Sequence, residues 1–128
     1  EISAEVNKVW EYYVKPEHIT KWNFASDEWH CPKAENDLRV GGKFTSRMKA
    51  KEGSLGFDFK GKYDEVIDHE KIAYSMSDAR QVITTFENGD NGIRVKTVFD
   101  AEKENPIEMQ RAGWQAILDN FKKYVEQN

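Results

Sequence analysis

The sequence is poor in residues that form covalent or metal cross-links. Cys31 is the one cysteine in 128 residues, which excludes an internal disulfide and a zinc site built from several thiolates. Apolar runs extend over a few residues only, so we expect no membrane insertion, and no hydrophobic leader follows the N-terminus. We therefore expect a cytoplasmic protein with no metal and no cofactor.

The sequence also lacks an excess of positive charge. The chain has 19 Lys and Arg against 23 Asp and Glu, which leaves a formal net charge of −4. Phosphate backbones and anionic lipid surfaces are bound by basic surfaces, so this balance argues against both as partners. We expect no nucleic-acid partner.

Proline and linker-like composition are sparse, whereas aromatic residues are abundant. Three prolines, no internal repeat and a length of 128 residues are typical of one domain, which we place at residues 1–128. Aromatic residues make up 12% of the chain, as four Trp, five Tyr and seven Phe. Disordered chains are depleted in such residues, so this chain is expected to fold around an aromatic core.

Hydrophobic spacing predicts helices near both ends of the chain. A first helix is expected over 3–14 with Ser3 as its cap, a short second helix over 17–22, and an ordered loop over 23–35. A long helix follows the signature Asn105-Pro106-Ile107-Glu108, which reads as a cap, a proline at the first helical position and a capping-box glutamate. Its apolar stripe comprises Met109, Ala112, Gly113, Ile117, Phe121, Tyr124 and Val125.

Between residues 38 and 99 the hydrophobic period changes to two. The alternating segments are 43–50, 57–63, 71–77, 81–87 and 93–99. Alternation of this kind predicts an antiparallel sheet with one apolar face, and the turn-forming stretches 51–54 and 88–92 predict hairpins. The long helix is the one large partner for that face. The fold class is therefore α+β: a curved antiparallel sheet of five or six strands around a long C-terminal helix, with two short N-terminal helices closing one end.

The side chains on the apolar face are large. They are Phe44, Met48, Phe57, Phe59, Tyr63, Tyr74, Met76, Phe86, Phe99 and Trp114. They can form a filled core, or a bent sheet and a straight helix can leave a cavity between them, which is a common form of a small-molecule site. Gly113 bears on this choice because glycine within a helix costs about 1 kcal/mol relative to alanine. It either admits a close strand or leaves room for a ligand.

Several segments carry a family resemblance. These are residues 3–10 (SAEVNKVW), 15–19 (KPEHI) with Trp22, 37–44 (DLRVGGKF), 61–66 (GKYDEV) and Gly113-Trp114. Taken in order, they resemble the family named for homology to the activator of the heat-shock-protein-90 ATPase, which belongs to the START-like, helix-grip (SRPBCC) superfamily. The resemblance implies a helix-grip fold, and the superfamily includes lipid and sterol carriers, polyketide cyclases and co-chaperone domains. Family members begin with a strand before the first helix, so with at most Glu1 and Ile2 available we expect a truncated first strand.

The candidate ligand-binding residues follow from the apolar face and from the loop before it. They are Trp29, Phe44, Met48, Phe57, Phe59, Tyr63, Met76, Gly113 and Trp114.

The polar candidates are His30, Cys31 and Glu65. A thiolate beside an imidazole can act as a nucleophile, but neighbours in an extended chain point in opposite directions, so a structural or rim role is favoured for His30 and Cys31. Glu65 shares the inward parity of Tyr63, unless a bulge after Tyr63 turns Val66 inward and Glu65 outward. His18 and His69 show no metal-ligand spacing with His30 and are read as surface residues.

Three functional hypotheses remain. The favoured one is non-enzymatic binding of a hydrophobic or amphipathic small molecule between the sheet and the C-terminal helix. The second, implied by the resemblance, is a module that contacts a chaperone ATPase. The third is a cyclase- or hydrolase-type enzyme that uses Glu65, His30 or Tyr63.

Overall fold

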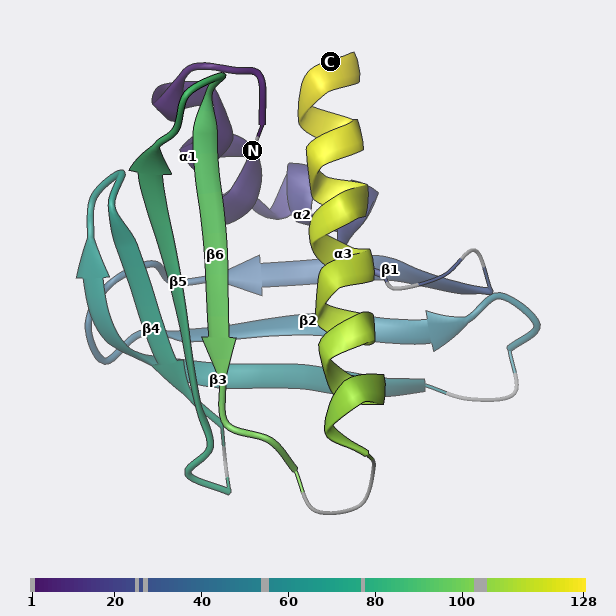
Figure 1. Ribbon diagram of the computed structural model, residues 1–128. Coiled ribbons are helices and arrows are strands. Elements are labelled where there is room, and N and C mark those ends of the chain that lie inside the picture. The colour runs from purple at the N-terminus through teal and green to yellow at the C-terminus, as the bar shows by residue number, and fades with distance from the viewer. Residues whose placement is uncertain (1, 25, 27, 54–55, 77, 103–105) are drawn as a thin grey trace.

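Two N-terminal helices precede a run of strands, and a long helix ends the chain (Figure 1). The structure is a computed structural model that describes residues 2–128 except 25, 27, 54–55, 77 and 103–105. In chain order the elements are α1 (Val6–Val14), α2 (Pro16–Trp22), β1 (Trp29–Asn36), β2 (Lys43–Ala50), β3 (Gly56–Ile67), β4 (Lys71–Ser75), β5 (Gln81–Asn88), β6 (Ile93–Phe99) and α3 (Ile107–Gln127).

The strands form one six-stranded antiparallel sheet in the order β1-β2-β3-β4-β5-β6. The sheet is strongly bent, so β1–β3 and β5–β6 run in very different directions while α3 lies across the concave side (Figure 1). The predicted alternation is confirmed: Val82, Thr84 and Phe86 on β5 are buried, as are Ser46 and Met48 on β2. The predicted α+β class, a curved sheet around a C-terminal helix, is therefore correct.

The loop predicted over 23–35 is wrong, because its second half forms strand β1 at the edge of the sheet. β1 pairs with β2 through Trp29↔Ala50 and His30↔Lys49, and the register shifts before Lys33 pairs with Arg47. Pro32 lies inside this irregularity. An edge strand tolerates proline because the missing N–H removes no bond that a central strand would need. The bulge interrupts the alternation, which hid the strand from the sequence pattern.

The helix ends also differ from the predictions. α1 begins at Val6 with an extended Glu5 before it and no side-chain cap, whereas the backbone N–H of Ser3 donates to the Glu126 carboxylate at 2.8 Å. α2 includes Pro16 as its first residue, and α3 begins one residue after Pro106. Asn105, the predicted cap of α3, lies outside the described residues. The backbone of Ile2 forms an isolated antiparallel bridge with Ile93, which ties the start of the described chain to β6.

The two histidines that were read as surface residues, His18 and His69, are partly exposed and also pack against aromatic rings. The ring of His18 stacks on Tyr12 at 4.1 Å between centroids, and its Nδ1 lies 2.8 Å from the hydroxyl of Tyr124. The ring of His69 stacks on Trp10 at 5.4 Å. Both side chains thereby join the α1 region to the rest of the molecule.

Helix α3 is buried at its C-terminal half and exposed at its start. Phe121 and Val125 have no exposed surface, and the ring of Phe121 meets Tyr13 at 5.2 Å and Trp22 at 4.8 Å. In contrast, the side chains of Ile107 and Met109 are each 64% exposed. The predicted apolar stripe is therefore only partly a packing surface. α3 is clamped at one end, beside α1 and α2, and separates from the sheet at the other.

This asymmetry predicts that replacing a side chain by alanine has unequal effects on stability at the two ends of α3. Phe121→Ala should lower the free energy of unfolding by about 3–5 kcal/mol because it empties a fully buried ring site. Met109→Ala, on the same helix but exposed, should change the free energy of unfolding by less than about 0.5 kcal/mol. Urea denaturation of both variants measures the difference, and equal losses would contradict the one-ended clamp.

Candidate functional site

A cavity of about 560 Å³ lies between the N-terminal half of α3 and the bent sheet. Strands β2 and β3 position its floor, because their register places Met48 opposite Phe57 and Ser46 opposite Phe59. The predicted residues that line this outer cavity are Met48, Phe57, Phe59, Met76, Gly113 and Trp114. Phe99, Met109 and Ile117 complete its apolar wall.

Gly113 faces open space from α3. A Cβ built on Gly113 would meet no heavy atom within 4 Å. The alternative that Gly113 admits a close strand is therefore wrong, and the glycine widens the space beneath the helix. The neighbouring Trp114 stacks on Phe99 at 5.5 Å between ring centroids and meets Phe59 edge-on at 6.2 Å.

A second, smaller cavity of about 80 Å³ lies behind the Phe59–Trp114 pair. Phe59, Trp114, Ile117 and Asn23 line both cavities, so the two are adjacent. We call the larger one the outer cavity and the smaller one the inner pocket. The predicted residues Phe44 and Tyr63 line the inner pocket.

Several residues that carry hydroxyl or amide groups line the inner pocket, whose surface is otherwise mostly apolar. Its polar lining residues include Tyr13, Asn36, Ser46, Tyr63, Tyr74 and Thr97.

The hydroxyl of Tyr63 belongs to a polar chain that runs into α1. It donates to Oδ1 of Asn36 at 2.5 Å, and Nδ2 of Asn36 donates to the backbone oxygen of Val14 at 2.6 Å. A second chain joins the hydroxyls of Tyr13 and Thr84 at 3.4 Å and those of Thr84 and Thr97 at 3.0 Å.

Burial keeps the tyrosines of the inner pocket uncharged. Desolvation raises the pKa of Tyr13 above its ordinary value, and it raises the pKa of Tyr63 and of Tyr74 much further. At neutral pH these phenols therefore remain neutral. They can bind a ligand through hydrogen bonds, but they are poorly placed to act as bases.

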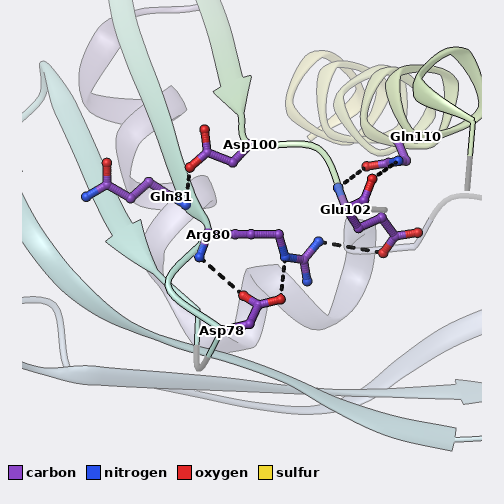
Figure 2. Close-up of polar contacts among 6 residues, drawn as sticks. All are labelled: Asp78, Arg80, Gln81, Asp100, Glu102 and Gln110. Carbon is purple, nitrogen blue, oxygen red and sulfur yellow. Dashed lines mark hydrogen bonds and ion pairs between the residues drawn. The ribbon is translucent and has the colours of Figure 1, made fainter. Parts of the chain in front are cut away.

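Charged residues gather at the mouth of the outer cavity (Figure 2). Nε of Arg80 lies 2.6 Å from the Asp78 carboxylate, and a guanidinium nitrogen of Arg80 lies 3.6 Å from Glu102. The side chain of Gln110 on α3 holds the backbone of Glu102 through two hydrogen bonds of 2.9 and 3.1 Å. The backbone N–H of Gln81 donates to Asp100 at 2.9 Å. This rim thus ties the β4–β5 connection to the segment between β6 and α3.

The rim was not predicted from the sequence. Its members are separated by up to several tens of residues and form no motif along the chain. The one local signal is the spacing of Asp78 and Arg80, where the N–H of Arg80 and its side chain both bind the carboxylate and lower the pKa of Asp78. Phe99 and Ile117, in contrast, were predicted to face inward, Phe99 from the alternation of its strand and Ile117 from the apolar stripe of the C-terminal helix.

Trp29 and the polar candidates line neither cavity. The ring of Trp29 meets Phe57 edge-on at 5.8 Å, beside the outer cavity. Cys31 is 2% exposed, its thiol donates to the backbone oxygen of Lys33 at 3.6 Å, and burial raises its pKa. His30, next to it in the strand, is half-buried. These features favour the structural interpretation of Cys31 over that of a nucleophile.

Glu65 is turned away from the interior by a bulge. The register of β3 against β4 shifts between Tyr63 and Glu65, Val66 packs against the core, and the Glu65 carboxylate lies 2.6 Å from the Lys71 ammonium. The prediction that Glu65 points inward is therefore wrong, and the alternative, a bulge after Tyr63 that turns Glu65 outward, is correct. Glu65, His30 and Tyr63 thus do not line one common cavity.

No described helix is long and apolar enough to cross a membrane. Among the described His, Cys, Asp and Glu residues, no three or more gather closely enough to hold a metal ion.

An antiparallel sheet curved around a long C-terminal helix, with a hollow beneath that helix, defines a START-like protein of the helix-grip (SRPBCC) fold. The chain belongs to the family described as Activator of Hsp90 ATPase homolog 1-like protein, whose model matches residues 3–126. No curated protein matches the chain.

Solved structures agree with this assignment. The solution structure of an AHSA1-like protein from Aeromonas hydrophila is 43% identical, with a TM-score of 0.92, covering 98% of this chain and 88% of that one. A protein from Cytophaga hutchinsonii is 47% identical, with a TM-score of 0.84 and coverage of 99% and 88%. A protein from Nitrosomonas europaea shares the fold at 22% identity, with a TM-score of 0.85 and coverage of 99% and 90%.

The open space at Gly113 predicts that alanine is tolerated there. Gly113→Ala should raise the free energy of unfolding by about 1 kcal/mol, since the helix gains propensity and the new methyl group meets nothing. Gly61→Ala is the matched control, because its Cβ would lie 2.8 Å from the Phe44 ring, and it should lower the free energy of unfolding by about 1–3 kcal/mol. Thermal and urea denaturation compare the two, and destabilisation by Gly113→Ala would contradict the open space.

Burial of Cys31 predicts an inert thiol. Because its folded pKa is raised, the thiol stays protonated at pH values where the unfolded thiol ionises, so its contribution to stability is lost as pH rises above the ordinary thiol pKa. Ellman's reagent should react with native protein at about pH 8 at least tenfold more slowly than with protein in guanidinium chloride. Rapid reaction of the native thiol would revive the nucleophile hypothesis.

Proposed function

We propose that this protein binds a hydrophobic or amphipathic small molecule in the outer cavity and inner pocket, without catalysing a reaction on it. The observation that carries the proposal is the separation of α3 from the sheet at Gly113. There the helix interior carries the residue with the poorest helix propensity after proline, at a position where a side chain would meet only open space.

The size and lining of the outer cavity support this proposal. Small-molecule sites occupy roughly 300–1,000 Å³ and are mostly apolar with a few polar groups, and the outer cavity of about 560 Å³ lies within that range. Its walls are aromatic rings and thioethers, of which Phe59, Met76 and Trp114 are examples. Methionine adapts to ligands of different outline because its side chain is unbranched and flexible.

A chaperone-directed role is the alternative that the family description suggests. It would require a partner surface on the outside of the molecule. Of the large apolar side chains that are exposed, Phe57 and Met109 line the outer cavity and Ile107 lies near Met109 at the start of α3, whereas Val40, Ile67 and Val98 occur singly on different segments. Single exposed apolar residues are normal for protein surfaces, so they do not favour this role over ligand binding. A pull-down with the host's heat-shock-protein-90 homologue tests the alternative directly.

Filling the cavity from α3 should abolish ligand binding without harming the fold. Gly113→Leu places a branched side chain in the outer cavity, whereas Ala112→Leu places the same side chain on an exposed neighbouring position of the same helix. Tryptophan fluorescence titrations with fatty alcohols, sterols and aromatic polyketides, together with native mass spectrometry, measure binding. We expect at least a tenfold loss of affinity for Gly113→Leu alone, because the ligand would have to displace the new side chain.

Two outcomes would argue against the proposal. Equal affinities of the Gly113→Leu and Ala112→Leu variants would show that ligands bind elsewhere. Absence of binding by the unmodified protein to every member of the panel, with no co-purifying ligand in native mass spectrometry, would remove the proposed function.

A further inference from the structure

Tyr74 forms part of one wall of the inner pocket. Tyr74 is 8% exposed and lies on β4, paired with Tyr63 on β3 and Val82 on β5. Its ring packs edge-on against Phe44 at 4.7 Å and against Phe59 at 6.3 Å. The ring is therefore held in place from two sides while the residue lines the inner pocket.

Tyr74 differs from the other two tyrosines of the pocket. The hydroxyl of Tyr63 is hydrogen-bonded to Asn36 and that of Tyr13 to Thr84. Among the described residues, no group hydrogen-bonds to the hydroxyl of Tyr74. No fully enclosed side-chain oxygen or nitrogen among the described residues lacks a partner, so the hydroxyl of Tyr74 keeps some accessible surface on which another group can bind. A ligand oxygen in the inner pocket would supply the missing partner.

The charges around both cavities disfavour an anionic ligand. Glu35 is the one charged residue among those described in the lining of the inner pocket; its exposed carboxylate lies 3.2 Å from the Lys33 ammonium, and no described Lys or Arg belongs to that lining. At the mouth of the outer cavity Lys60 and Arg80 are outnumbered by acidic residues, and Arg80 is already paired. Those acidic residues are Asp58, Asp78, Asp100 and Glu102. A carboxylate buried without a counter-charge pays a large desolvation cost, whereas an alcohol or a ketone pays little.

The two cavities meet at shared lining residues. The outer cavity and the inner pocket share Phe59, Trp114 and Ile117, so an apolar body in the outer cavity can extend its tip past the Phe59–Trp114 pair. Tyr74 lines the inner pocket and not the outer cavity. A polar tip at the inner end of the ligand is therefore the part that reaches Tyr74.

We propose that the inner pocket is a subsite for an uncharged oxygen, a hydroxyl or carbonyl group, which the hydroxyl of Tyr74 binds. The ligand class is then a neutral apolar molecule with a polar tip, and not a fatty acid anion. This inference rests on the proposed function, since it assigns the chemistry of the same site.

The test compares two probes that differ at the tip, 1-decanol and decanoate, by isothermal titration calorimetry at about pH 7, where the carboxylate is ionised. The unmodified protein should bind 1-decanol at least tenfold more tightly than decanoate. Tyr74→Phe should weaken 1-decanol about five- to tenfold, the equivalent of one neutral hydrogen bond, and leave decanoate unchanged. It should not lower the melting temperature, because the removed hydroxyl has no partner among the described residues.

Tyr63→Phe is the matched control within the same pocket. It removes a hydroxyl that is already bound to Asn36, so it should lower the melting temperature and keep the preference for 1-decanol. Equal affinities of the unmodified protein for the two probes, or unchanged 1-decanol binding by Tyr74→Phe, would overturn the subsite and leave the proposed function standing. Failure of the unmodified protein to bind either probe, or any of the broader panel, would overturn both.

Discussion

The rest of the structure depends on the clamp between the C-terminal half of α3 and the N-terminal helices. Phe121 is enclosed by the rings of Tyr13 and Trp22, and Val125 is fully buried one turn further on. A straight helix pressed against one end of a bent sheet cannot follow the sheet at its other end. The cavity beneath Gly113 is therefore a consequence of where the helix is anchored, and the protein keeps a stable core while leaving space inside. The residues of α3 that stabilise the fold lie in its C-terminal half, and those that line the candidate binding site lie in its N-terminal half. Mutations can therefore change one property without changing the other.

The interior beneath α3 combines a larger outer cavity, with charged groups at its mouth, and a smaller inner pocket whose lining includes three tyrosines. Burial raises the pKa of Tyr63 and Tyr74, so these phenols offer hydrogen bonds without charge. The charged groups lie at the rim, where Arg80 is paired with Asp78 and Glu102 (Figure 2). These pairs hold the mouth together and neutralise Arg80, and the four acidic residues there outnumber Arg80 and Lys60. Such an arrangement suits recognition of a neutral ligand better than acid–base catalysis, which needs titratable groups near neutral pH.

Much of the outer cavity could be predicted from the sequence because strand parity decides which side chains face inward. Met48, Phe59 and Met76 were identified by this rule, and Gly113 by its cost in a helix. The rule failed where a bulge resets the parity, as it does between Tyr63 and Glu65 and between His30 and Lys33. Tyr74 was recognised as an inward side chain, but the lack of a partner for its hydroxyl depends on what surrounds it in space and has no signature along the chain.

Local patterns in the amino-acid order were sufficient for the α+β class, the antiparallel hairpins, the apolar stripe of α3 and the family resemblance. These features depend on side-chain period and turn chemistry, which are properties of neighbouring residues. The fit between helix and sheet, the division of the hollow into two chambers and the rim that joins Arg80 to Glu102 depend on distances between remote segments. Whether inward-facing rings fill a space or line it is a question of the volume left after packing, and that volume exists only once the bend of the sheet and the anchor of the helix are both set.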